Sequence, residues 1–218
     1  QRYDGSGTRL GSEFQANAYT TGNQRIPSVS VSPAGGFVVV WRSTNLDGSD
    51  YAVAARRFDA SGSAVGNEFV VNTYTTGRQY GTFGQVAHDA RGNFVVAWAS
   101  GGAGVYDVFA QRFSAAGVRR GAEFRANAFT TGSQERPRVA SDAVGNFVVT
   151  WESDLQDGSD FGAFAQRFGG LAPAALAVDA PGNGVLQPGE SVDVRPSWRN
   201  FNGAPQTVSA TLANMTGP

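Results

Sequence analysis

The sequence predicts an all-β protein made of β-propeller-type four-stranded antiparallel blades, followed by a smaller β domain. Short sequence motifs return at a fixed spacing of 55 residues through residues 1–168, and a period near fifty residues marks a repeat architecture. Each copy contains short apolar or alternating segments separated by turn residues, which is typical of antiparallel strands. No window shows the 3.6-residue apolar period of a helix, so we expect almost no helix.

Landmark residues at constant offsets define the repeat. Each copy is marked by an arginine, a glutamate, an asparagine and a glutamine. These positions are Arg2, Arg57, Arg112 and Arg167; Glu13, Glu68 and Glu123; Asn17, Asn72 and Asn127; and Gln24, Gln79 and Gln134. Because they recur, we expect them to build the fold. The glutamates are predicted to cap backbone N–H groups or to pair with the recurring arginines.

Four strands are predicted in each copy. In the first copy, residues 13–17 and 29–32 alternate between apolar and polar side chains, as in half-buried strands. Phe37–Trp41 is continuously apolar, which predicts a strand buried on both faces in the middle of a sheet. The last strand is Tyr51–Phe58. Turn residues such as those at 33–36 separate the strands, and the strand at 13–17 is expected to begin a new sheet.

Three copies cannot close a propeller, because propellers have at least four blades. Two alternatives remain for this chain. Either the other blades lie outside it and the three copies are part of a larger propeller, or the copies stack as an open solenoid. We favour the larger propeller.

Composition excludes several classes of function. Charged residues make up 16% of the chain and the formal net charge is -1, so no strong field attracts nucleic acid. The absence of cysteine excludes disulfides, thiol catalysis and cysteine-bound metals. No apolar run reaches the roughly 18 residues of a membrane span. We therefore expect neither a nucleic-acid partner nor a membrane span.

The repeat stops after Phe168, and the composition changes. Residues 169–176 are rich in Gly, Pro and Ala, which indicates a linker. The segment from Asp179 to about Asn200 then contains Gly182-Asn183-Gly184 and Pro188-Gly189-Glu190. It resembles the opening of immunoglobulin-like adhesion modules of bacterial surface and secreted proteins.

This resemblance implies a partial Ig-like β-sandwich over residues 177–218. Strand patterns lie at 191–198 and 206–212. Because a complete Ig-type sandwich needs about 100 residues, the domain is expected to be truncated at Pro218.

The repeats also resemble a known type of module. Motifs such as FVVVW at 37–41, DGSDY at 47–51 and GNEFVVN at 66–72 are similar to a repeat of large, multi-domain bacterial extracellular proteins, often found beside calcium-binding or adhesion modules. The resemblance implies a secreted or surface-displayed protein. It implies no defined activity.

A search for catalytic residues gives none. His88 is the only histidine, and its place just before a hairpin turn is interpreted as a surface-loop position. One histidine and no cysteine argue against a Ser–His triad or a histidine-rich metal site. The chain is therefore predicted not to be an enzyme, and no cofactor-binding residues are predicted.

Calcium is the one cofactor that the sequence suggests. Asp154, Asp157 and Asp160 are spaced at i, i+3 and i+6, and Asp47 and Asp50 repeat part of this pattern in the first copy. Clustered carboxylate oxygens beside a glycine turn are suitable ligands for calcium. The alternative is that these aspartates form Asx turns in solvated hairpin loops.

The functional hypothesis is a non-catalytic module of a secreted or cell-surface bacterial protein. It would serve adhesion, surface display, or binding of a glycan or protein ligand at the blade loops. The alternative is an accessory region of a secreted hydrolase whose catalytic domain lies outside this chain. Further domains of the same precursor or other copies of the chain are expected partners. Function is expected where the copies differ, in the loops around Asp47, Gly101 and Asp157.

Overall fold

The computed structural model of the chain describes residues 1–48, 50–75, 85–102, 104–169, 171–179 and 193–200. The chain divides into two compact units, Gln1–Gly169 and Gly170–Pro218. Every regular element in the described residues is a β-strand, which confirms the all-β prediction. None of these residues belongs to a helix that is long and apolar enough to cross a membrane.

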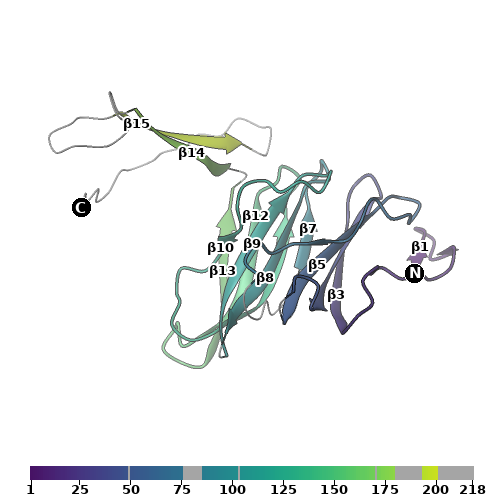
Figure 1. Ribbon diagram of the computed structural model, residues 1–218, viewed down its shortest axis with the longest axis horizontal. Coiled ribbons are helices and arrows are strands. Elements are labelled where there is room, and N and C mark those ends of the chain that lie inside the picture. Colours follow the sequence, from purple (N-terminus) through teal and green to yellow (C-terminus); the bar gives the residue numbers. More distant parts are fainter. Residues whose placement is uncertain (49, 76–84, 103, 170, 180–192, 201–218) are drawn as a thin grey trace. The chain divides into compact units, whose positions relative to one another are not determined.

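The first unit contains three antiparallel sheets that follow one another in chain order (Figure 1). Blade 1 has the strand order β3-β4-β5-β6 and blade 2 the order β7-β8-β9-β10, while blade 3 has the order β11-β12-β13. A two-stranded hairpin, β1-β2, precedes them. The strands are β1 (Arg2–Tyr3), β2 (Arg9–Leu10), β3 (Gln24–Val31), β4 (Phe37–Thr44), β5 (Tyr51–Phe58), β6 (Phe69–Val70), β7 (Gln85–His88), β8 (Phe94–Gly102), β9 (Val105–Phe113), β10 (Phe124–Arg125), β11 (Gln134–Ser141), β12 (Phe147–Asp154) and β13 (Phe161–Phe168).

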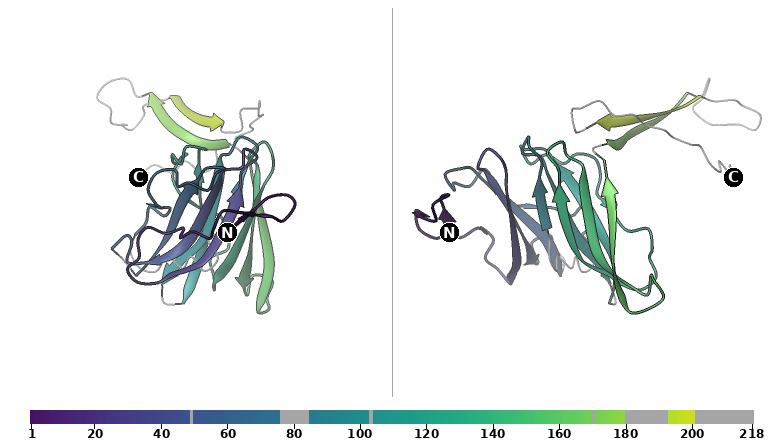
Figure 2. Two further views of the ribbon diagram at one scale, coloured as in Figure 1. Left: turned by 90° about the vertical axis from the view of Figure 1, so that its right-hand side faces the viewer. Right: turned by 180° about the vertical axis from the view of Figure 1, so that it is seen from behind.

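The sheets form propeller-like blades packed face to face. Figure 2 shows the purple, teal and green sheets stacked side by side in the first unit. The meander order, with each strand paired to its chain neighbour, is that of a propeller blade. The prediction of four-stranded antiparallel blades is confirmed for blades 1 and 2.

The boundary between blades differs from the predicted one. The short strand that carries the recurring Glu-Phe motif was expected to begin a new sheet. Instead β6 pairs with β5, through Ala55 and Phe69, and β10 pairs with β9. The motif therefore forms the outer strand of the sheet that precedes it. Ten residues connect β5 to β6 and β9 to β10, and hydrogen bonds from the backbone N of Val65 to Arg57 and of Arg120 to Arg112 return the chain along the same sheet.

Blade 3 and the first copy each lack one predicted strand among the described residues. Blade 3 contains three strands, and β13 has no described partner beyond β12. Residues 13–17 of the first copy, which correspond to the outer strands β6 and β10, form no strand. An outer strand pairs with a third strand, and no third strand lies beside residues 13–17 among the described residues.

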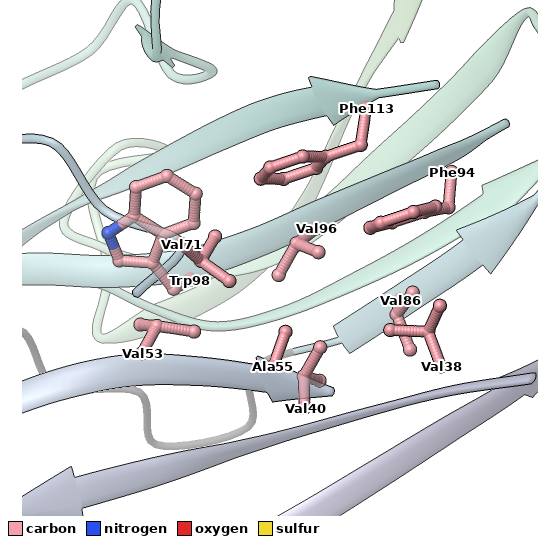
Figure 3. Close-up of a cluster of buried hydrophobic side chains, with 10 residues drawn as sticks. All are labelled: Val38, Val40, Val53, Ala55, Val71, Val86, Phe94, Val96, Trp98 and Phe113. Atoms are coloured by element: carbon pink, nitrogen blue, oxygen red, sulfur yellow. The ribbon is translucent and has the colours of Figure 1, made fainter. Parts of the chain in front are cut away.

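The middle strands are buried on both faces, as the continuous apolar motif predicts. In β8, Phe94, Val96 and Trp98 belong to a buried cluster with Val38, Val40, Val53 and Ala55 of blade 1, drawn in Figure 3. Val95 and Ala97 of the same strand belong to a second cluster with Phe147, Val149 and Trp151 of blade 3. Successive side chains of a strand point to opposite faces, so one strand contributes to both cores.

Aromatic rings join each outer strand to the blade that follows it. Phe94 and Phe113 are stacked with their centroids 4.9 Å apart, and Phe69 of blade 1 lies 5.6 Å from Phe113. The same three-ring contact recurs at the next junction with Phe124, Phe147 and Phe168. At the start of the stack, Phe14 covers Phe37 and Phe58.

Two first strands contain a proline inside a bulge. The pairing register shifts between Arg25 and Ser28 in β3 and between Glu135 and Arg138 in β11. The residues that precede Pro27 and Pro137 have positive φ, 56° at Ile26 and 50° at Arg136. Proline cannot donate to a strand ladder and is tolerated at such bulges. The strands continue through the bulge to the glutamine landmark, further than the alternating pattern predicts.

The second unit contains a described hairpin, in which β14 (Leu171–Asp179) pairs antiparallel with β15 (Asp193–Asn200). Most of the residues predicted as a linker, 169–176, therefore form a strand. β15 overlaps with the strand predicted at 191–198. The Gly-Asn-Gly and Pro-Gly-Glu turns and the strand predicted at 206–212 lie outside the described residues, and the Ig-like assignment stays a prediction.

Candidate functional site

The blade stack has two different ends. At the turn end, the three β3–β4-type turns at 33–36, 90–93 and 143–146 lie with the turns that follow the third strands, at 59–62 and 114–117. At the loop end lie the connections β4–β5, β8–β9 and β12–β13, together with the segments that lead to the next blade. Because equivalent strands run in the same direction in each blade, equivalent connections share one end.

The turn end is built from hydrogen bonds that the turns make to themselves. The Oδ1 atom of Asp59 accepts from the backbone N of Ser61 at 2.8 Å and of Ser63 at 2.9 Å. These bonds favour the ionised carboxylate, and the hydroxyl of Ser61 contributes most to lowering the pKa of Asp59. Asp4 and Asp142 make equivalent turns, also with a lowered pKa. These carboxylates already accept hydrogen bonds from the backbone of their own turns.

The recurring glutamates and arginines connect neighbouring copies. Glu68 accepts from the backbone N of Ala18 at 2.6 Å and of Tyr19 at 2.9 Å, and Glu123 accepts from that of Thr73 at 2.6 Å. The prediction that these glutamates cap backbone N–H groups is confirmed. Arg57 donates from Nη1 to the carbonyl of Ala115 in the next blade, at 2.9 Å. Neither set is arranged for chemistry.

The recurring asparagines close the outer strands at the loop end. Asn127 accepts from the backbone N of Val108 at 2.7 Å and donates to the carbonyl of Phe129 at 2.8 Å. Asn72 makes the same two bonds, to Val53 and Tyr74. Both asparagines are almost fully buried. Their role is structural, as the fixed spacing predicts.

His88 lies at the end of β7 rather than in a surface loop, which corrects the sequence interpretation. Its Nδ1 atom is 2.8 Å from the hydroxyl of Ser30 in blade 1, and its ring lies 5.5 Å from that of Phe94. The neighbouring copies carry Val31 and Ser141 at this position, each two residues after the first-strand valine that corresponds to Val86. His88 thus fills a junction between two blades.

Burial gives His88 a predictable effect on stability. Desolvation lowers the pKa of His88, and the Asp89 carboxylate opposes this shift. The unfolded histidine titrates near pH 6.5, so below that pH the unfolded chain binds more protons than the folded chain. The contribution of neutral His88 to the free energy of unfolding is therefore fully present above about pH 6.5, and it declines as the pH falls toward the lowered pKa of the folded state.

Urea unfolding at pH 7.5 and pH 5.5 checks this effect. His88 is the only histidine and cysteine is absent, so no other histidine or thiol titrates in this range. We expect a lower urea midpoint at pH 5.5, and we expect His88→Val to remove most of the difference. A variant that loses as much stability as the parent between the two pH values would contradict the assignment.

The five aspartates proposed as calcium ligands lie at the loop end. Asp157 accepts from the backbone N of Ser159 at 3.2 Å in an Asx turn, and Asp47 accepts from the side-chain amide of Asn72 at 3.2 Å. Asp154 ends β12, and Asp50 and Asp160 close their loops through their backbone carbonyls. Within the described residues, no three acidic or histidine side chains are grouped closely enough to hold a metal ion.

Calcium binding at Asp154, Asp157, Asp160, Asp47 and Asp50 therefore stays a prediction. Melting the protein in calcium and in chelator checks it, because an ion bound only to the folded state raises the midpoint. Equal midpoints would contradict it.

An aromatic row crosses the loop end, which sequence reasoning missed. The third strand begins with an aromatic residue in blade 1, Tyr51, and in blade 3, Phe161. In blade 2 the equivalent residue is Tyr106, one residue after the start of the third strand. These residues are spaced by 55 and were hidden among the structural landmarks. Tyr51 and Tyr106 are half-buried, while 53% of Phe161 is exposed. We call these three residues the aromatic row.

The polar groups around the aromatic row differ from blade to blade. In blade 1, the Arg42 guanidinium lies 4.4 Å from the centroid of the Tyr51 ring. In blade 2, Arg125 and Asp107 form an ion pair at 3.5 Å. In blade 3, Arg136 and Glu152 are 2.7 Å apart. The loop end thus combines a repeated aromatic position with a cation–π contact in blade 1 and ion pairs in blades 2 and 3.

Further apolar side chains are exposed at the same end. Tyr74 follows the outer strand of blade 1 and is 58% exposed, Val105 begins β9 and is 51% exposed, and Leu155 in the β12–β13 loop is 52% exposed. Two of these lie in or beside the loops where the copies differ. The loop end therefore presents rings, apolar side chains and hydrogen-bonding groups together.

Comparisons with known proteins give a fold likeness to solved structures. No family model matches the chain, and no curated protein matches it. Among solved structures, the endo-arabinase from Bacteroides thetaiotaomicron VPI-5482 is similar with a TM-score of 0.39 and 11% sequence identity. The match covers 65% of this chain and 55% of the endo-arabinase chain.

This finding contradicts the prediction that the chain is not an enzyme, since a similar solved structure is that of an enzyme. That prediction is withdrawn. The likeness does not carry the activity of the endo-arabinase over to this chain. What this chain does has to be inferred from its own side chains.

Proposed function

We propose that this chain is a glycan-binding region of a secreted bacterial protein that acts on polysaccharides, as an accessory region of a hydrolase. The observation that carries the proposal is the aromatic row at the loop end, with charged groups that differ from blade to blade. Aromatic side chains offer a rigid apolar face that suits the C–H face of a sugar ring. Carboxylate and guanidinium groups offer paired hydrogen bonds to vicinal hydroxyls.

The repetition of the aromatic position in each blade favours a polymer over a single sugar. Each blade contributes one aromatic position, so the row repeats along the blade stack as sugar rings repeat along a chain. Tyr51 and Tyr106 are half-buried and held by their blades, while Phe161 is exposed. Loops on a rigid scaffold are common places for binding residues. The self-bonded turns at the other end offer fewer unsatisfied groups.

An array of neutral and acidic polysaccharides, followed by affinity electrophoresis on any glycan that binds, tests the proposal. Phe161→Ala is expected to weaken binding about tenfold, the effect of losing one aromatic contact. Val118→Ala is the matched control, because Val118 is an exposed apolar residue of the turn end. It should leave binding unchanged.

Two results would count against the proposal. One is an array on which no glycan binds, and the other is a glycan whose binding is equal for the parent and for Phe161→Ala. Release of reducing ends from a bound glycan, measured with the same preparation, separates binding from hydrolysis by the chain itself.

A further inference from the structure

The blade stack has two outer sheet faces, one on blade 1 and one on blade 3, and they expose different side chains. The leading face is the uncovered side of blade 1, and its first strand exposes Val29 by 59% and Val31 by 63%. The equivalent of Val29 in blade 2 is Val86, which is 7% exposed because it packs against blade 1. The leading face is therefore the surface that would be covered by one more preceding blade.

The trailing face is the uncovered side of blade 3. Thr150, Ala163 and Ala165 are exposed there. Their equivalents in blades 1 and 2 are fully buried at the junctions to the next blade; they are Val40, Val53, Ala55, Ala97, Val108 and Ala110. The trailing face thus corresponds to the surface that accepts a following blade.

A groove on the trailing face is lined by the equivalents of residues that line a groove between blades 1 and 2. Between blades 1 and 2, the groove bounded by Phe37, Val38 and Arg57 also contacts Ala90, Arg91 and Gly92 of blade 2. On the trailing face, the equivalent groove is bounded by Phe147, Val148 and Arg167. It lacks the turn of a following blade among the described residues.

The outer edge of β13 and residues 14–15 also have no strand partner among the described residues. β13 has no described partner on its outer side, whereas β5 and β9 pair with β6 and β10. Phe14 and Gln15, the equivalents of Phe69–Val70 and Phe124–Arg125, form no strand within their own chain. An open edge strand accepts an added strand readily.

We propose that a second copy of this chain docks its leading face on the trailing face, and that two such contacts close a six-bladed ring. Each contact is heterologous, and rotation decides whether such contacts close. Two sets of three blades give six, which lies within the four to eight blades of known propellers. In this ring, residues 14–15 of one copy become the fourth strand of blade 3 in the other.

The 55-residue spacing fixes which residues meet at the new junction. Ala140 and Val31 take the places of Ser30 and His88, so an apolar pair replaces a hydrogen bond. Glu13 takes the place of Glu123, whose partner is the backbone N of Thr73. Its own partner is then the backbone N of Ala128 in the other copy, an exposed residue of the present chain.

One segment of the chain competes with this docking. Arg2 contacts the carbonyls of Ala60 and Ser61, as Arg57 contacts that of Ala115 in the next blade. Residues 1–3 therefore occupy the place that residues 166–168 of a second copy would take. Deleting residues 1–3 is expected to lower the dissociation constant of the dimer.

Sedimentation velocity of the full chain over a concentration series tests the proposal. We expect a species of twice the chain mass of 22.8 kDa that does not grow further. A chain that stays monomeric at all concentrations, or one that grows into larger oligomers, would overturn the closed ring.

Two variants test the direction of the contact. Val31→Arg alters only the leading face and Ala163→Arg only the trailing face. A buried, unpaired arginine is strongly unfavourable, so each variant alone should raise the dissociation constant at least about 100-fold. A mixture of the two should form a dimer again through one contact, in which the unaltered leading face of Ala163→Arg meets the unaltered trailing face of Val31→Arg, while the other contact carries both arginines and stays open.

The single variants distinguish this arrangement from a symmetric one. If like faces met, one variant would stay dimeric on its own, because the face through which it pairs is unaltered, and that result would overturn the proposal, as would a mixture that stays monomeric. Val118→Arg, on an exposed residue away from both faces, controls for the added charge and should remain dimeric. Circular dichroism melts confirm that each variant is folded, since both altered positions are exposed.

Discussion

Replacing Trp98 by alanine is expected to lower the free energy of unfolding of the repeat unit by about 3 to 5 kcal/mol. Trp98 is 1% exposed and lies in the cluster between blades 1 and 2, beside Val71 and Val53 in Figure 3. Its removal leaves a cavity between two sheets that are each held by their own hydrogen bonds. Such sheets cannot easily collapse to fill it.

Urea unfolding followed by circular dichroism measures this loss. Val118→Ala is the control, because Val118 is 64% exposed and exposed substitutions change stability by about 0.5 kcal/mol or less. A Trp98→Ala variant as stable as this control would mean that the blades do not pack through this cluster.

Replacing Asn127 by alanine is expected to cost about 1 to 3 kcal/mol, the cost of leaving buried polar groups without partners. Asn127 is 3% exposed, and its amide bonds to Val108, Phe129 and Asp107. Val108 is fully buried, so water cannot replace the bond that its N–H group loses. The loss is measured as a shift of the urea midpoint.

Asn17→Ala provides a matched comparison at the same repeat position. Asn17 is half-buried and donates to the carbonyl of Tyr19 at 2.9 Å, and its Oδ1 accepts at 3.5 Å from the Gln15 side chain. Because no third strand lies beside it, we expect a loss of about 1 kcal/mol or less. Equal losses at Asn17 and Asn127 would show that the bond to the strand backbone contributes little.

The repeat period and the apolar pattern were enough to predict the fold class. Phe94–Trp98 alternates between two cores, and the continuous apolar motif predicts this from the sequence alone. The recurring glutamates could be assigned a capping role because their spacing matches the spacing of the copies. In both cases a local pattern directly reflects a contact that every copy makes.

Contacts between copies were harder to predict. The Glu-Phe strand pairs with the strand before it, yet its sequence is the same whether it ends one sheet or begins the next. His88 was read as a loop residue because its burial comes from Ser30 and blade 1, which lie far away in the chain. The proline bulges in β3 and β11 likewise depend on pairing with the neighbouring strand.

The candidate site was predicted only as a region. The loops around Asp47 and Asp157 lie at the loop end, as expected from their differences between copies. The aromatic row was overlooked because Tyr51, Tyr106 and Phe161 share the period of the structural residues. These residues differ from the core phenylalanines in being more exposed to solvent. They are more exposed because they lie at the start of their strands, at the loop end of each blade, and the repeat period does not reveal that position.

The account rests on consecutive blades packed face to face, and an engineered disulfide tests this most directly. A β-carbon at Gly92 of blade 2 would lie 3.8 Å from that of Ser32 in blade 1, within the range of disulfide-bonded cysteines. The chain contains no cysteine of its own. We expect Ser32→Cys with Gly92→Cys to form an intramolecular disulfide on oxidation, detected by peptide mass spectrometry. Ser32→Cys with Gly145→Cys, which lies one blade further on, should stay reduced. A reduced first pair, or a disulfide in the second, would contradict the packing of the blades.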